Sequence, residues 1–109
     1  MKVIPMRLPE GDALTQAFAT VRGASGAAIE VGTARLREGE RVPLEGTSRH
    51  RGIEISYVLS GVVDVVNEAG TQRIAQGDLV IVPADQWHYS LVREEATLIY
   101  ALFEDAKCE

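Results

Sequence analysis

The chain has 109 residues, of which 46% are hydrophobic and 25% charged, a composition typical of one globular domain. Its net charge of −5 argues against a nucleic-acid-binding or acidic-membrane-binding surface, and no apolar run reaches the roughly 18 residues of a membrane span. A single cysteine, Cys108, excludes an internal disulfide framework, so we expect a cytoplasmic protein in which Cys108 is an exposed thiol.

The first forty residues carry the weaker structural signals. Met1–Glu10 has a lone Lys2 and an apolar stretch broken by proline, so we expect no signal peptide there. Met1–Arg7 is interpreted as a short edge strand or as a strand exchanged with a second subunit, which would also cover an exposed edge. Asp12–Thr20 fits either a short helix capped by Asp12 or a strand, whereas the loose alternation of Ala27–Arg37 favours a strand.

Short β-prone runs dominate the rest of the chain, and glycines separate many of them. Such runs at near-regular spacing predict an all-β sandwich or barrel. The runs are Ile53–Leu59, Val62–Val66, Leu79–Val82, Tyr89–Val92 and Thr97–Phe103.

Two turns are predicted between these runs. Glu68-Ala69-Gly70 can close a hairpin between Val62–Asn67 and Thr71–Ala75, with Gly70 supplying a positive φ. Gln76-Gly77-Asp78 has the composition of a second turn.

Ile53–Leu59 is apolar on both faces of the predicted strand. If Glu54 faces the interior, alternation places Ser56 and Val58 beside it. The other face then carries four apolar side chains that need cover, so we expect a homodimer. These side chains are Ile53, Ile55, Tyr57 and Leu59.

The chain holds only two histidines, and both lie near the ends of predicted strands. His50 precedes Glu54 by four residues at the entry to a strand, and His88 follows Trp87 near the start of a later one. Two neutral imidazoles and one carboxylate are the ligand set of non-haem Fe(II), with Mn, Ni, Zn or Co as alternatives. The competing interpretation is that each residue is an ordinary solvated surface group.

Two sequence motifs contain these three residues. Gly39-x10-His50-x3-Glu54-x6-Gly61 resembles the first signature of the cupin superfamily, G-x5-H-x-H-x3,4-E-x6-G. Gly77-x5-Pro83-x-Asp85-x2-His88 resembles the second, G-x5-P-x-G-x2-H-x3-N. The motifs occupy about residues 39–61 and 77–92 of what we interpret as a single cupin domain over residues 1–109. The resemblance implies a double-stranded β-helix, the jelly-roll barrel of small and commonly dimeric cupins.

The resemblance also implies a metal site, from which this chain departs at one ligand. His50, Glu54 and His88 match metal-ligand positions, whereas the first motif histidine falls on Ser48. A serine hydroxyl is a poor ligand for a borderline metal, so Ser48 would instead hydrogen-bond a metal-bound water. We therefore expect at most one divalent transition metal per chain, held by three ligands. The alternative is a polar pocket without metal, in which His50 and Glu54 act as a catalytic acid–base pair.

Further residues are candidates for a small-molecule pocket. Arg49 and Arg51 are interpreted as a solvated rim, with anchoring of an anionic substrate as the alternative, and Glu45 is a candidate replacement for Ser48 as ligand. The tyrosine hydroxyls could orient a substrate, although tyrosine more often packs on a sheet, and alternation favours a packing role for the tryptophan. The pocket candidates are Ser48, Ser56, Tyr57, Trp87 and Tyr100.

Two functions are consistent with these features. The first is a metal-dependent enzyme acting on a small organic molecule, of dioxygenase, decarboxylase, isomerase or lyase type, because a fold does not fix the chemistry. The second is a non-catalytic binding or sensory cupin with an incomplete metal site. Neither function involves nucleic acid or a membrane.

Overall fold

The computed structural model describes residues 1–104, so Cys108 lies outside the described range. This part of the chain forms β-strands and no helix, which confirms the predicted all-β class. None of the described residues belongs to a helix that could cross a membrane. The strands are β1 (Thr15–Arg22), β2 (Ala28–Leu36), β3 (Arg41–Val42), β4 (Ile53–Asn67), β5 (Gly70–Ala75), β6 (Leu79–Val82) and β7 (His88–Glu104).

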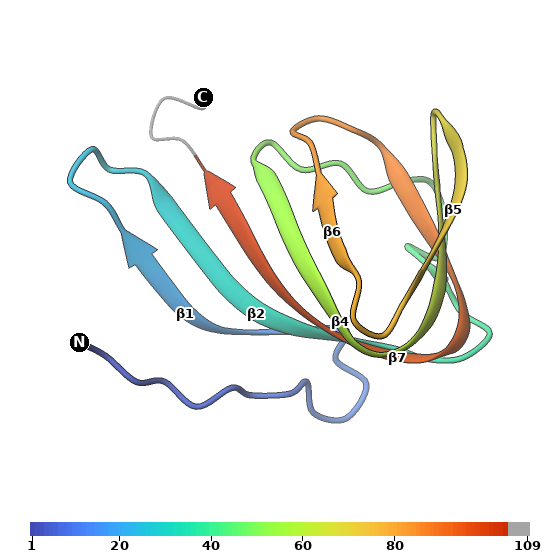
Figure 1. Cartoon of the computed structure of the whole chain (residues 1–109), viewed down its shortest axis with the longest axis horizontal. Coiled ribbons are helices and arrows are strands. Elements are labelled where there is room, and N and C mark those ends of the chain that lie inside the picture. The colour runs from blue at the N-terminus through green and yellow to red at the C-terminus, as the bar shows by residue number, and fades with distance from the viewer. Residues whose placement is uncertain (105–109) are drawn as a thin grey trace.

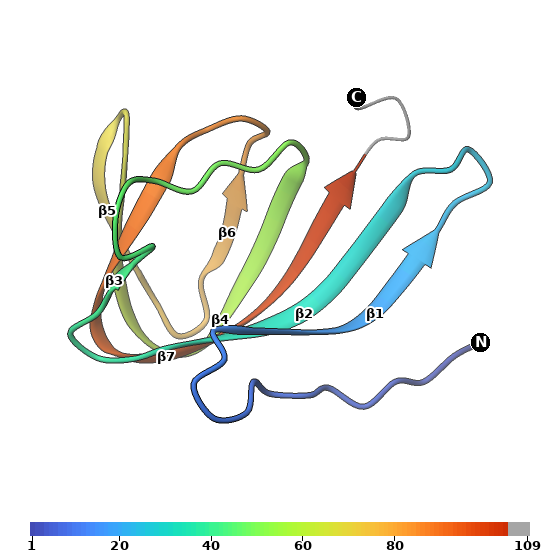
Figure 2. The same cartoon turned by 180° about the vertical axis from the view of Figure 1, so that it is seen from behind.

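All strand pairs are antiparallel, in the order β1-β2-β7-β4-β5, with β3 paired to β7 and β6 to β4. The sheet folds over on itself (Figures 1 and 2). One wall contains β1, β2, the C-terminal part of β7, the N-terminal part of β4 and β6. The remaining parts of β4 and β7 form the facing wall with β5. This arrangement is consistent with the expected jelly-roll barrel.

β4 and β7 are each continuous, whereas the sequence suggested two strands in each segment. The glycine that we interpreted as a break, Gly61, lies inside β4 with a φ of +91°. The β4–β7 register shifts between Val58 and Val63, so the paired strands bend there without ending. A side chain at residue 61 would collide with the backbone of Glu95 and Ala96, and glycine permits this close approach.

Both predicted turns are confirmed. Gly70 adopts a φ of +123° at the β4–β5 hairpin, where the side-chain oxygen of Asn67 accepts a 2.9 Å hydrogen bond from the amide of Ala69. At the second turn Gly77 adopts a φ of +93°, and the Asp78 carboxylate accepts a 2.8 Å hydrogen bond from the amide of Ala75.

The structure decides between some of the alternatives that the sequence left open for the N-terminal segment. β1 shows that the segment after Asp12 is a strand rather than a helix. Met1–Arg7 belongs to no strand of its own chain, although the carbonyl of Arg7 accepts a hydrogen bond from the Thr33 hydroxyl. Exchange of this segment between subunits stays a prediction.

The hydrophobic core lies between the two walls. Its buried side chains come from β2, β4, β5 and β7, so every long strand except β1 contributes. Val58 is fully buried, as expected for a residue on the same face as Glu54 and Ser56. The core residues are Leu36, Val58, Val63, Ile74, Val92, Ala96 and Leu98.

A buried carboxylate connects three strands of the facing wall. Asp64 of β4 accepts hydrogen bonds from Arg73 of β5, at 2.9 and 3.1 Å, and from Arg93 of β7, at 2.8 Å. The two guanidinium groups, Arg73 first, hold the pKa of Asp64 well below its usual range. The ionised carboxylate therefore stabilises this end of the fold.

We predict that Asp64→Asn destabilises the protein at neutral pH, and that the difference from wild type shrinks below about pH 4, the ordinary pKa of aspartate. Because the folded-state pKa is depressed, the stabilisation is complete above the unfolded-state pKa and is lost as pH falls toward the folded-state value. Urea unfolding across this pH range measures the difference, with Glu68→Gln at the exposed hairpin as the control. A difference that stays constant into acid would contradict the role of the charge.

Candidate functional site

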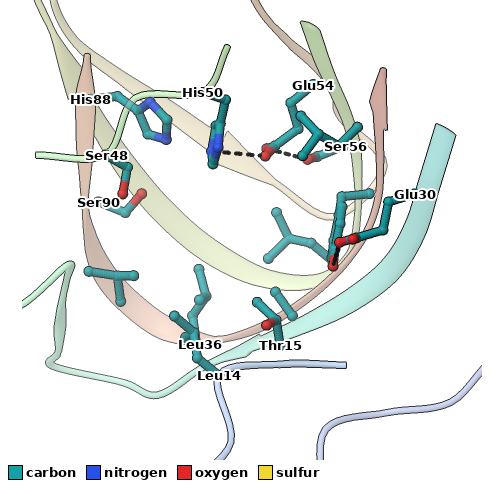
Figure 3. Close-up of a pocket in the computed structure, with 15 residues that line it drawn as sticks. Leu14, Thr15, Glu30, Leu36, Ser48, His50, Glu54, Ser56, His88 and Ser90 are labelled. Atoms are coloured by element: carbon teal, nitrogen blue, oxygen red, sulfur yellow. Dashed lines mark hydrogen bonds and ion pairs between the residues drawn. The ribbon is translucent and has the colours of Figure 1, made fainter. Parts of the chain in front are cut away.

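The two walls enclose a cavity of about 340 Å³ (Figure 3). Core residues Leu36 and Leu98 belong to its lining, so the hydrophobic core forms part of the cavity wall. Polar side chains from β4, β7 and the loop before β4 gather on one side. The full lining is Leu14, Thr15, Glu30, Ala34, Leu36, Val42, Ser48, His50, Glu54, Ser56, His88, Ser90, Leu98, Tyr100 and Leu102.

Glu54 and Ser56 reach the cavity because they alternate along the start of β4. The His50 Nε2 atom lies 3.2 Å from Glu54 Oε1, and the Ser56 hydroxyl donates a 3.0 Å hydrogen bond to Glu54 Oε2. Both carboxylate oxygens therefore have a partner, and Ser56 restricts the orientation in which Glu54 meets His50.

The loop that carries His50 is attached to the loop before β7. The carbonyl of His50 accepts a 2.7 Å hydrogen bond from the amide of Asp85. Asp85 has a φ of +61° and occupies the position where the second cupin signature has glycine. Aspartate tolerates this left-handed conformation better than most residues, so the departure from the signature preserves the backbone geometry.

His88, the first residue of β7, lies beside Ser48. Their backbones exchange two hydrogen bonds, of 2.8 and 2.9 Å, which hold the loop before β4 against the start of β7. The His88 ring centroid is 5.7 Å from that of His50, and its Nδ1 atom is 3.5 Å from the carbonyl oxygen of Gln86. Both histidines therefore line the same cavity, with Glu54 on the far side of His50 (Figure 3).

Three donors do not yet form a metal-binding group in this arrangement. Within residues 1–104, no three His, Cys, Asp or Glu side chains are grouped so that they could hold a metal ion. His50 Nε2 and Glu54 Oε1 are 3.2 Å apart, and the ring centroids of His50 and His88 are 5.7 Å apart. The donor types suit a divalent transition metal, and binding would require the three side chains to converge on one ion.

Glu30 and Tyr100 form a second polar group in the cavity, and sequence reasoning missed Glu30. The Tyr100 hydroxyl donates a 2.9 Å hydrogen bond to Glu30 Oε2. Burial raises the pKa of Tyr100 to about 12, with further contributions from Glu30 and Glu54. Gly32 provides the room for this ring, because a Cβ there would lie 2.6 Å from Tyr100 Cζ. Alternation of Glu30 with Ala34 and Leu36 in the predicted strand was the available signal.

The other candidates divide between the cavity and the surface. Ser48, Ser56 and Tyr100 line the cavity, whereas Tyr57 and Trp87 do not. Tyr57 lies on the outer face of β4, since alternation directs it away from Ser56 and leaves it 43% exposed.

The charged loop residues also stand outside the cavity lining. Arg49, Arg51 and Glu45 are exposed, as the rim interpretation predicts for the two arginines. Glu45 therefore does not replace Ser48 beside the histidines.

The chain belongs to the cupin family, because the sequence profile of the cupin domain matches residues 32–102. This range includes both signature motifs and all but three of the cavity-lining residues, because Leu14, Thr15 and Glu30 lie on its N-terminal side. No curated protein matches the chain.

Solved structures support the same fold. A cupin superfamily protein from Desulfitobacterium hafniense is 16% identical, with a TM-score of 0.64 over 84% of this chain and 77% of that one. The cupin domain of Cnp3 from Schizosaccharomyces pombe is 18% identical, with a TM-score of 0.65 over 86% and 67% of the two chains. KdgF from a Halomonas species is 19% identical, with a TM-score of 0.63 over 85% and 78%. At these identities the likeness concerns the fold.

We predict that Tyr100 keeps its proton until about pH 12, because ionisation would place a second negative charge beside Glu30 in a poorly solvated position. Ultraviolet titration measures the step, which Tyr100→Phe should remove. Glu30→Gln should move it to lower pH, since the variant removes the neighbouring charge while burial remains. A Tyr100 titration that is unaffected by Glu30→Gln would contradict the contact.

Proposed function

We propose that this protein is a small metal-binding cupin that takes a small organic molecule into its cavity. The observation that supports the proposal is the position of the only two histidines of the chain, which line one cavity together with Glu54. Apolar side chains such as Leu36, Leu98 and Leu102 line other parts of the same cavity. A mostly apolar pocket with a few convergent polar groups is the usual form of a small-molecule site.

His50, Glu54 and His88 would hold the metal, which could be Fe, Mn, Ni, Zn or Co. The metal would supply a Lewis acid that polarises an oxygen atom of the bound molecule. Ser56 would keep Glu54 oriented by its 3.0 Å hydrogen bond, and the Gln86 carbonyl near His88 Nδ1 would leave the other ring nitrogen available. Ser48 beside His88 would bind water or ligand rather than metal.

A metal-free pocket is the second candidate, and one contact favours it. His50 Nε2 and Glu54 Oε1 are already 3.2 Å apart, so the imidazole and the carboxylate can pair with each other directly. An imidazole beside a carboxylate can transfer a proton near neutral pH, so this pair could serve as acid and base toward a ligand. The same pocket without such chemistry would be a binding or sensory site.

Metal analysis of protein purified without chelator separates the two candidates. We predict about one metal ion per chain in wild type, and loss of the metal in His50→Ala and in His88→Ala because each removes one of three ligands. Ser90→Ala is the matched control, since Ser90 lines the cavity without belonging to the proposed ligands. Folding of each variant is checked by circular dichroism. No metal under any loading condition would contradict the first candidate and leave the second.

The Ser48 position provides a gain-of-function arm of the same test. Ser48→His restores the missing donor next to His88, so it should raise metal affinity in a competition titration. An unchanged affinity would mean that the ion does not sit beside residue 48.

We also propose that the protein is a homodimer that uses the outer face of β4, β6 and β7. Leu79 and Ile81 are 62% and 61% exposed, and they pair with Tyr57 and Ile55 of β4. Ile53 and Phe103 extend the same apolar surface across the neighbouring β4–β7 pair. Because this surface carries no charge of its own, a second copy of it would be a complementary partner, as in a twofold-symmetric interface.

Ile81→Lys tests this interface, since it introduces one charge at the centre of the apolar surface. We predict that the variant is a monomer by analytical ultracentrifugation at concentrations where wild type is a dimer. Gln72→Lys on exposed β5 introduces the same charge elsewhere and should leave the dimer intact. Equal sedimentation of wild type and Ile81→Lys would refute the use of this face.

A further inference from the structure

The charge of the cavity comes from two acidic residues on different strands. Glu30 of β2 and Glu54 of β4 line it, and no Lys or Arg belongs to the described lining. Both carboxylates affect the Tyr100 hydroxyl. Burial is the main cause of its raised pKa, and Glu30 and Glu54 raise the pKa further. These two carboxylates therefore give the cavity a negative potential, which poorly solvated walls concentrate.

The nearest basic residues lie outside the cavity. Arg49 and Arg51 are exposed and do not line it. A neighbouring hollow shares Glu30 and Leu102 with the cavity and contains Arg22, but Glu104 lines that hollow as well and offsets the arginine. An anionic ligand would therefore find no direct cationic partner among the protein side chains of the cavity.

Glu30 differs from Glu54 in what its oxygens contact. Glu54 meets His50 with one oxygen and Ser56 with the other, so both of its oxygens are engaged. Glu30 Oε2 accepts the Tyr100 hydroxyl, and the described residues provide no side-chain hydrogen bond to Glu30 Oε1. A half-buried carboxylate with one oxygen engaged is oriented, and it can still accept a hydrogen bond from a ligand.

We propose that Glu30, oriented by Tyr100, is a specificity-determining residue that selects ligands carrying a hydroxyl or ammonium donor and rejects anions. The proposal rests on the proposed function, because it assumes that the cavity binds a small organic molecule. The ligand places its apolar part against Leu36 and Leu98 and its donor against Glu30. A divalent metal near Glu54 would offset the negative charge of Glu54. Glu30 would then be the remaining anionic group in the cavity.

Three probes with one skeleton and different charges test the proposal: cyclohexylmethylammonium, cyclohexanemethanol and cyclohexanecarboxylate. Their common ring fits an apolar wall, so differences in affinity report the polar group. Binding to the chelator-treated full chain is measured by nuclear magnetic resonance titration at about pH 8, where an unperturbed imidazole is neutral. We expect the cation to bind at least about tenfold more tightly than the carboxylate, with the alcohol in between.

Glu30→Gln should reduce this preference at least about threefold, and the remainder is expected from Glu54, which also lines the cavity. Glu68→Gln removes the same charge at an exposed hairpin and should leave the order unchanged. Tyr100→Phe removes the hydrogen bond that orients Glu30. It should therefore weaken binding of the alcohol, whose hydroxyl donates to Glu30.

The possible failures are distinguishable. Preferential binding of the carboxylate, or a preference for the cation that Glu30→Gln leaves unchanged, would overturn the role of Glu30 while binding in the cavity stands. If none of the three probes shifts the resonances of cavity residues, the proposed small-molecule function itself fails, and the selectivity fails with it.

Discussion

The bend in the β4–β7 pair is the constraint on which the candidate site depends. Glu54 pairs with Leu102 at one end of this ladder, and His88 pairs with Asn67 at the other. In a straight ladder these two ends would be far apart. The register shifts around Gly61, and the absence of a side chain there, let the two strands fold over together, so that both ends line one cavity. The metal-ligand candidates thus line one cavity because of a backbone feature that is not itself part of the site.

The two walls on either side of this bend have different roles. The facing wall is held by Asp64 with Arg73 and Arg93, while the other wall presents Glu30, Glu54 and Ser56 to the cavity. These ion pairs do not compete with the polar groups of the cavity, because Asp64, Arg73 and Arg93 do not line it. Most of the cavity is therefore formed by strands, and loops supply Leu14, Ser48 and His50. The loop that carries Ser48 and His50 is fixed by hydrogen bonds to Asp85 and His88.

Much of this arrangement could be predicted from sequence because it depends on local periodicity. Strand alternation placed Glu54, Ser56 and Val58 on one face, and turn composition located both turns. Gly61 was misinterpreted because a glycine at a turn and a glycine at a bend look alike in sequence, and only the neighbouring Ala96 backbone distinguishes them. Alternation along the predicted strand could have placed Glu30 on the inner face, but its contact with Tyr100, seventy residues later, is not encoded by any local pattern.

The central claim is that the two histidines of the chain bind the same metal ion in one cavity. Nitrogen-15 spectra of the imidazoles during a Zn(II) titration test it most directly, because a chain with two histidines gives two assignable ring systems. The account predicts that both rings shift together and stop shifting at about one equivalent of zinc, as for two ligands of a single ion. If only one ring responds, or if neither does, the two histidines do not share a metal.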